Sequence, residues 1–228
     1  MEAPFGKFDM DRIKRGCVVY IIGSDRAAKS RIVDSLLGDA VNGVEVSPGD
    51  ALCRRPGARI ERTVDPVVFQ DDANKYLILN NCLKRSMEEA SFQELLKGIG
   101  DKDLLLVMSS VKPTLRLPVH IRDRVNYVFL QKDSANRLMF ELYGGVFGDY
   151  DEFKSAVKNC EHRYIVIDMS FLGWQGGPPN VGDHVFWYDS GGEGDDHGGI
   201  GVEEFEVLDE VLPWRPLSGL ACLWTGRE

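Results

Sequence analysis

The chain has 228 residues, of which 43% are hydrophobic and 28% charged, and 27 basic against 36 acidic residues give a net charge of −9. These values are ordinary for a globular protein and exclude collagen-like and disordered chains. No apolar run approaches the roughly 18 residues that a membrane-spanning helix needs, and the negative charge argues against a protein that coats nucleic acid. Nine acids between Asp189 and Glu210, a stretch without Lys or Arg, account for the whole negative balance.

The N-terminal residues and the cysteines both predict a reducing, intracellular environment. The basic residues near the start are not followed by an apolar stretch, so no signal peptide is expected. The cysteines are odd in number, widely scattered and never spaced as C-x-x-C, so we expect neither a disulfide framework nor a zinc site. We expect them to be buried as small apolar residues: Cys17, Cys53, Cys82, Cys160 and Cys222.

Strand-like and helix-like segments alternate along the chain, which predicts an α/β fold with a mainly parallel sheet. Apolar runs with continuous rather than alternating character, typical of strands buried on both faces, occupy residues 17–22, 76–79, 103–108, 125–130, 164–168 and 184–188. Helical periodicity covers residues 30–37, 86–96, 134–143 and 151–159. Residues 38–66 are expected to form loops or a short irregular excursion. We predict one domain over residues 1–190 and an acidic, Gly-rich linker and tail over 191–228.

A strand, a short polar segment and a helix follow one another at residues 17–37, where a phosphate-binding loop would be expected. Gly23, Lys29 and Ser30 fit the pattern G-x-x-x-x-G-K-[ST], but Ala28 stands where the second glycine belongs. In such loops backbone N–H groups surround the phosphates, the lysine reaches the outer phosphates and the hydroxyl binds Mg²⁺. The alternative interpretation is a serine-capped helix with an exposed lysine in its first turn.

Nucleotide hydrolysis also needs a carboxylate at the end of a neighbouring strand. The strand at 76–79 ends in Asn80 and Asn81, which carry no charge and are poor bases. Asp168 ends another apolar strand, but an aspartate that caps the following turn is the simpler interpretation. Four arginines near residue 58 (Arg54, Arg55, Arg59 and Arg62) are interpreted as solvated surface, with contact to DNA phosphates as the alternative.

Five segments in order resemble the genome-packaging ATPases of large eukaryotic DNA viruses, which belong to the FtsK/HerA branch of P-loop NTPases. These segments are FDMDRIKRGCVVYIIGSDRAAKS, YLILNNC, LRLPVHIRDRVNYVFL, LYGGVFGDYDEFKSAVKNC with YIVID, and VFWY. The resemblance implies a three-layer α/β sandwich that binds ATP and Mg²⁺ through Lys29 and Ser30. It places Asn80 and Asn81 at the family's paired acids and implies that Arg122 senses the γ-phosphate.

The departures from the family pattern fall at the positions that bind nucleotide and support hydrolysis in that family. Ala28 replaces a glycine, Asn80 and Asn81 replace acids, and Lys112 stands at the family's polar sensor. We therefore expect weakened nucleotide binding and a hydrolysis-deficient homologue, a pseudo-ATPase that acts as a nucleotide-binding or structural subunit. Whether the protein is an enzyme stays open at this point.

Two alternatives remain. The first is an active, divergent packaging motor that recruits a carboxylate such as Asp168 or Asp72. The second is a non-enzymatic interaction module whose acidic tail binds a basic protein. The resemblance also implies a homo-oligomeric ring, contact with viral DNA or a capsid component, no membrane, and a location in the host cytoplasm, a viral factory or the virion.

Overall fold

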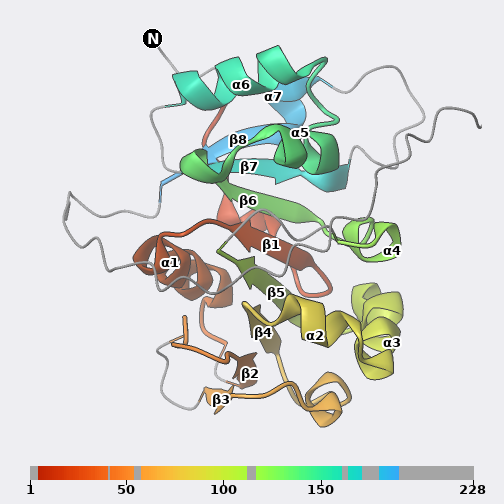
Figure 1. Cartoon of the computed structure of the whole chain (residues 1–228). Coiled ribbons are helices and arrows are strands. Elements are labelled where there is room, and N and C mark those ends of the chain that lie inside the picture. The colour runs from red at the N-terminus through yellow and green to blue at the C-terminus, as the bar shows by residue number, and fades with distance from the viewer. Residues whose placement is uncertain are drawn as a thin grey trace, which may run out of the picture. The chain divides into compact units, whose positions relative to one another are not determined.

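An eight-stranded sheet forms the centre of the part of the chain that the structure describes (Figure 1). This computed structural model describes residues 5–40, 42–53, 58–111, 117–160, 164–170 and 180–189. The strand order is β3-β2-β4-β5-β1-β6-β7-β8; the β6–β7 and β7–β8 pairs are antiparallel and the others parallel. The strands are β1 (Val18–Ile22), β2 (Gly43–Val46), β3 (Arg59–Glu61), β4 (Tyr76–Asn80), β5 (Leu105–Ser110), β6 (Tyr127–Gln131), β7 (Tyr164–Asp168) and β8 (Val185–Tyr188).

Helices cover both faces of the sheet, which gives the predicted three layers (Figure 1). The helices are α1 (Arg26–Leu37), α2 (Leu83–Met87), α3 (Ala90–Gly98), α4 (Val119–Arg122), α5 (Arg137–Tyr143), α6 (Tyr150–Asn159) and α7 (Val181–His184), and short 3₁₀ turns lie at Met10–Arg12, Pro66–Phe69, Ile99–Asp101 and Lys132–Ser134. Alternate strand residues feed two separate buried clusters. Val19 and Ile21 of β1 join the cluster beneath α1, whereas Val18, Tyr20 and Ile22 join the cluster shared with α2 to α6.

The predicted α/β fold with a mainly parallel sheet is confirmed, and all six predicted strands are present within two residues at each end. Residues 38–66, where loops or a short irregular excursion are expected, instead contain two strands of the sheet, β2 and β3. The helix predicted over 86–96 is two helices, since the chain turns at Glu88 and Glu89 between them. The helix predicted from residue 134 begins at Arg137, because Asn136 caps it by accepting a hydrogen bond from Met139 N at 3.1 Å.

The edge of the sheet at β8 is covered by the chain's own N-terminal segment. Phe8 N donates to Trp187 O at 2.8 Å, and Trp187 N donates to Gly6 O at 3.0 Å. The Phe8 ring makes edge-to-face contacts with Tyr127 and Phe129 at centroid distances of 5.4 and 5.5 Å. These backbone and ring contacts leave no exposed strand at this edge of the described sheet.

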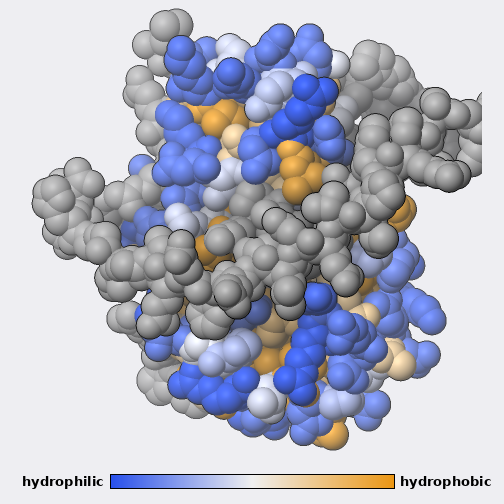
Figure 2. All heavy atoms as spheres, in the orientation of Figure 1, coloured by the Kyte–Doolittle hydropathy of each residue, from blue (hydrophilic) through white to orange (hydrophobic). Residues whose placement is uncertain are grey.

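The described surface is mainly hydrophilic, with apolar residues in small separate patches on the face shown in Figure 2. None of the helices in the described ranges has the length and apolar character needed to cross a bilayer. Cys53, Cys82 and Cys160 are buried as predicted and Cys17 is half-buried. Cys222, Lys112, Arg54, Arg55 and the acidic tail lie outside the described residues.

Candidate functional site

The segment between β1 and α1 is a tight turn followed at once by helix. α1 begins at Arg26, four residues before the predicted start, because Asp25 caps it: the carboxylate accepts a hydrogen bond from Ala28 N at 2.9 Å. Lys29 N donates to Asp25 O at 3.0 Å, as in any helical turn. The N–H groups of Ala28 and Lys29, which would face a phosphate in a phosphate-binding loop, are therefore both engaged within the first turn of the helix.

A glutamine from the neighbouring strand holds the turn in place. Gln131, the last residue of β6, accepts a hydrogen bond from Asp25 N through Oε1 at 3.0 Å. A Cβ at Gly23 would lie 2.3 Å from this oxygen, so a side chain at that position would displace Gln131. Gly23 thus makes room for Gln131, a residue that the sequence analysis did not single out.

Three consecutive residues near the start of α1, Ala28 to Ser30, are buried. Ala28 has no exposed surface and belongs to the apolar cluster beneath α1; Lys29 is 1% exposed and Ser30 9%. Burial lowers the pKa of Lys29 to about 8, an effect that the nearby charge of Asp25 opposes. The alternative interpretation of this segment is wrong in both particulars, because the capping residue is Asp25 and the lysine is not exposed.

Asn80 lies on the same face of the sheet as α1, at the carboxyl end of β4. Its Nδ2 donates to Ser47 Oγ at 3.0 Å, to Asp50 O at 3.0 Å and to Glu45 Oε1 at 3.4 Å. Its Oδ1 is buried without a hydrogen-bond partner, as is Oγ of Ser109, the residue beside it on β5. The amide therefore acts as a donor to three acceptors, a role that a carboxylate cannot fill.

Asn81 faces a different part of the molecule. It adopts a left-handed backbone conformation with φ of 55°, and its Oδ1 accepts a hydrogen bond from Val111 N at 3.1 Å. Its side chain is exposed and lines a cavity beside α2. Asn80 and Asn81, which the resemblance places at the family's paired acids, therefore lie in separate environments.

Glu45 is a buried carboxylate that the sequence analysis missed. It has no exposed surface, and its two oxygens accept hydrogen bonds from Leu52 N and Cys53 N, each at 2.7 Å. Burial raises the pKa of Glu45, while these backbone donors and Asn80 oppose the shift. Because both oxygens hold backbone N–H groups, Glu45 anchors residues 52–53 and is not placed to activate water.

The other candidate residues lie away from the start of α1. Arg122 is on α4, beyond the opposite face of the sheet, where its charge opposes the burial that raises the pKa of Tyr143 (Figure 1). Asp168 pairs with Tyr127, the first residue of β6, and accepts a hydrogen bond from Ser170 N at 3.0 Å. It therefore caps a turn at the opposite edge of the sheet, as the simpler interpretation predicted.

Asp72 is the other carboxylate suggested for an active motor. It precedes β4 and forms an ion pair with Lys102, so, like Asp168, it lies at the edge of the sheet where the parallel strands begin. The described residues contain no group of three or more His, Cys, Asp or Glu side chains arranged to hold a metal ion. A phosphate at the start of α1 would meet the Asp25 carboxylate, which would have to move before the phosphates of ATP could reach the N–H of Ala28.

No family model matches the sequence, and no similar sequence is found among curated proteins. Among solved structures, the genome-packaging NTPase B204 of Sulfolobus turreted icosahedral virus 2, in complex with sulfate, superimposes with a TM-score of 0.51 and 9% identity, over 69% of this chain and 94% of that chain. The DNA-packaging ATPase B204 of Sulfolobus turreted icosahedral virus gives a TM-score of 0.49 and 10% identity over the same shares. The chain therefore has the P-loop NTPase type of α/β fold that is seen in a viral genome-packaging NTPase.

Proposed function

We propose that this protein is a viral genome-packaging ATPase homologue that does not hydrolyse ATP and acts as a structural or nucleotide-binding subunit. The observation that carries the proposal is the environment of Asn80, whose amide donates to Glu45, Ser47 and the carbonyl of Asp50. Hydrolysis needs an acceptor at this strand end to hold the metal's water shell and to polarise the attacking water. Here the strand end supplies a donor instead, and the local structure depends on that donor.

The start of α1 supports the same proposal for nucleotide affinity. The Asp25 carboxylate occupies the hydrogen-bonding position of a phosphate at Ala28 N, and the Lys29 amine is buried beside it. ATP would have to displace this carboxylate and open the first turn of the helix. If it bound, Lys29 and Ser30 would be the residues placed to meet its phosphates and its Mg²⁺. We therefore infer that ATP binds weakly.

The test is phosphate release from Mg²⁺-ATP by the full chain, compared with Lys29→Ala. We expect no difference between the two, whereas turnover that Lys29→Ala abolishes would establish an active motor and overturn the proposal. None of the carboxylates suggested for such a motor lies near α1: Asp168 and Asp72 are at the opposite edge of the sheet.

Substitution of Asp25 separates its charge from its capping role. Asp25→Asn keeps a good N-cap but removes the negative charge, so we expect ATP to bind about tenfold more tightly with no loss of stability. Asp25→Ala removes both and is expected to cost about 1 kcal/mol of stability as well. Calorimetric titration with ATP and urea denaturation measure the two effects. Equal ATP affinity in the wild type and in Asp25→Asn would contradict the idea that this carboxylate occupies the phosphate position.

We further propose that the subunit joins a homo-oligomeric ring that contacts viral DNA or a capsid component, inside the infected cell or in the virion. The nine acids of residues 189–210 would supply a surface for a basic protein partner. Light scattering measures the mass of the particle in solution, which shows whether the subunit forms a ring. Replacement of the nine acids by Asn and Gln in the full chain tests the tail: unchanged partner capture at physiological salt would exclude its role.

A further inference from the structure

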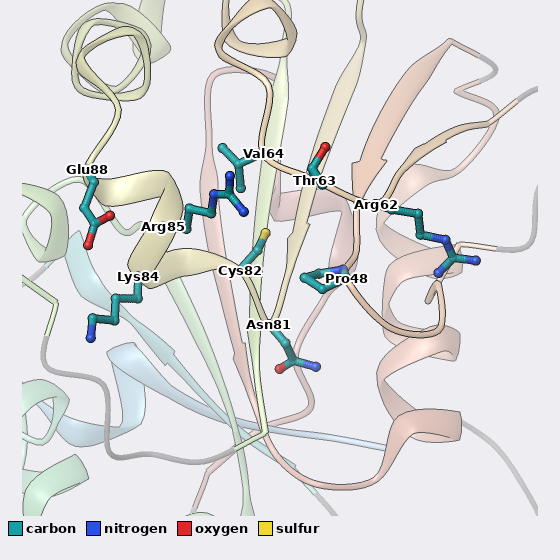
Figure 3. Close-up of a pocket in the computed structure, with 9 residues that line it drawn as sticks. All are labelled: Pro48, Arg62, Thr63, Val64, Asn81, Cys82, Lys84, Arg85 and Glu88. Carbon is teal, nitrogen blue, oxygen red and sulfur yellow. The ribbon is translucent and has the colours of Figure 1, made fainter. Parts of the chain in front are cut away.

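A cavity of about 410 Å³ lies beside α2, on the side of the β4 end where Asn81 is found (Figure 3). Its walls come from the segments that follow β2, β3 and β4, three parallel strands whose carboxyl ends meet at this edge of the sheet. Small-molecule sites in open α/β sheets form at this edge, and the volume falls within the range of roughly 300 to 1,000 Å³ that is usual for them.

The charged groups around the cavity are mostly basic: Arg62, Lys84 and Arg85 against Glu88. The Arg85 guanidinium points into the space between Cys82 and Val64, while Lys84 and Arg62 stand at opposite rims (Figure 3). Arg62 donates to the carbonyl of Gly49. Lys84 and Arg85 form no side-chain hydrogen bond or ion pair with any described residue, and the described lining holds three basic side chains against one acidic side chain.

Neutral donors and apolar walls complete the lining. Oδ1 of Asn81 accepts a hydrogen bond from Val111 N, so Nδ2 remains as a donor, and Thr63 contributes a hydroxyl to the lining at the far side of Pro48 (Figure 3). Burial raises the pKa of Cys82 to about 11, so this thiol stays uncharged at neutral pH. Pro48 and Val64 provide apolar surface that a ligand could cover.

We propose that this cavity binds the phosphate group of a small ligand of mononucleotide size, with Arg85 as the central contact. Arginine binds phosphate oxygens in a two-pronged geometry, and Lys84 can move its ammonium group over the rim. The site is independent of the proposed function, because Asn80, Lys29 and Asp25 lie on the other face of the sheet. The same chemistry could come from a free nucleotide or from the terminal phosphate of a nucleic-acid strand.

The experiment is calorimetric titration of the full chain with AMP, and with a four-nucleotide DNA carrying a 5′-phosphate or lacking it. We expect Arg85→Gln to weaken AMP binding about tenfold or more. Arg124→Gln is the matched control, since Arg124 is exposed and its side chain has no partner among the described residues.

Each outcome decides the proposal. Binding of AMP, or of the phosphorylated but not the unphosphorylated tetranucleotide, with loss in Arg85→Gln supports it and identifies the source of the phosphate. Equal binding of both tetranucleotides without AMP binding indicates general backbone attraction and overturns it. No binding of any probe at 5 mM (about the weakest affinity of interest), or binding that Arg85→Gln leaves intact, overturns it as well.

Discussion

Restoring an acid at residue 80 should destabilise the protein and should not revive catalysis. In Asn80→Asp the new carboxylate would face the Glu45 carboxylate, at the site where Asn80 Nδ2 now lies 3.4 Å from Glu45 Oε1. Two unit charges at that 3.4 Å separation repel by about 5 kcal/mol at an effective dielectric constant of about 20. Protonating the introduced carboxyl at pH 7 instead costs about 4 kcal/mol, given an ordinary pKa of about 3.9. The cheaper route sets the expected loss, about 4 kcal/mol.

Urea denaturation at pH 7 and at pH 4 measures this loss. The folded state raises the pKa of the introduced carboxyl, so the destabilisation is complete at neutral pH and fades as the pH falls towards the unfolded value near 4. Asn81→Asp is the matched control, because its exposed side chain can keep the hydrogen bond from Val111 N as a carboxylate. A loss below about 1 kcal/mol at pH 7, or one independent of pH, would refute the reasoning.

A double substitution tests the pairing of Glu45 with Asn80 directly. Glu45→Gln combined with Asn80→Asp exchanges donor and acceptor across the same contact. We expect the pair to recover about half of the stability lost in Asn80→Asp, since the backbone N–H of Leu52 or Cys53 loses its charged acceptor. Additive losses in the double variant would show that the two side chains do not interact.

Two further predictions concern α1. Ala28→Gly should lower the free energy of unfolding by about 1 to 2 kcal/mol, because glycine has a lower helix propensity and a buried methyl group is lost. ATP affinity should not increase. Tighter ATP binding would contradict the assignment of residue 28 to a helical turn. Because burial lowers the pKa of Lys29 to about 8, the unfolded chain binds more protons above that pH. The free energy of unfolding should therefore rise by about 1 to 2 kcal/mol between pH 8 and pH 9.5, and an equal rise in Lys29→Met would contradict this cause.

The start of α1 could have been predicted from the sequence, and a competing pattern obscured it. Asp25 is a favourable N-cap and Ala27 and Ala28 are strong helix formers, which together predict a helix from Arg26. The spacing of Gly23, Lys29 and Ser30 suggested a loop instead. The strand before it was predictable because five consecutive apolar residues are buried on both faces of the sheet.

The environment of Asn80 could not have been predicted, because it depends on long-range contacts. β2 has four residues and carries Glu45 within it, so its apolar pattern is broken. The burial of Glu45 is explained only by the folded structure, in which β2 lies beside β4 and residues 52–53 donate hydrogen bonds to the carboxylate. Gln131 is similar, since its contact with the turn depends on β6 lying beside β1. Sequence spacing alone does not bring these segments together.

The position of β1 in the sheet determines the order in which the protein can fold. β1 is the first of the eight strands to leave the ribosome, yet it lies between β5 and β6. Its two partners are complete only when Ser110 and then Leu130 have been synthesised. Until Ser110 is made the five apolar residues of β1 have no neighbouring strand, and until Gln131 is made the turn at Asp25 lacks the contact that holds it. Sheets closed by such distant pairings fold slowly, so the nascent chain carries an aggregation-prone strand while the 88 residues from Gly23 to Ser110 are made.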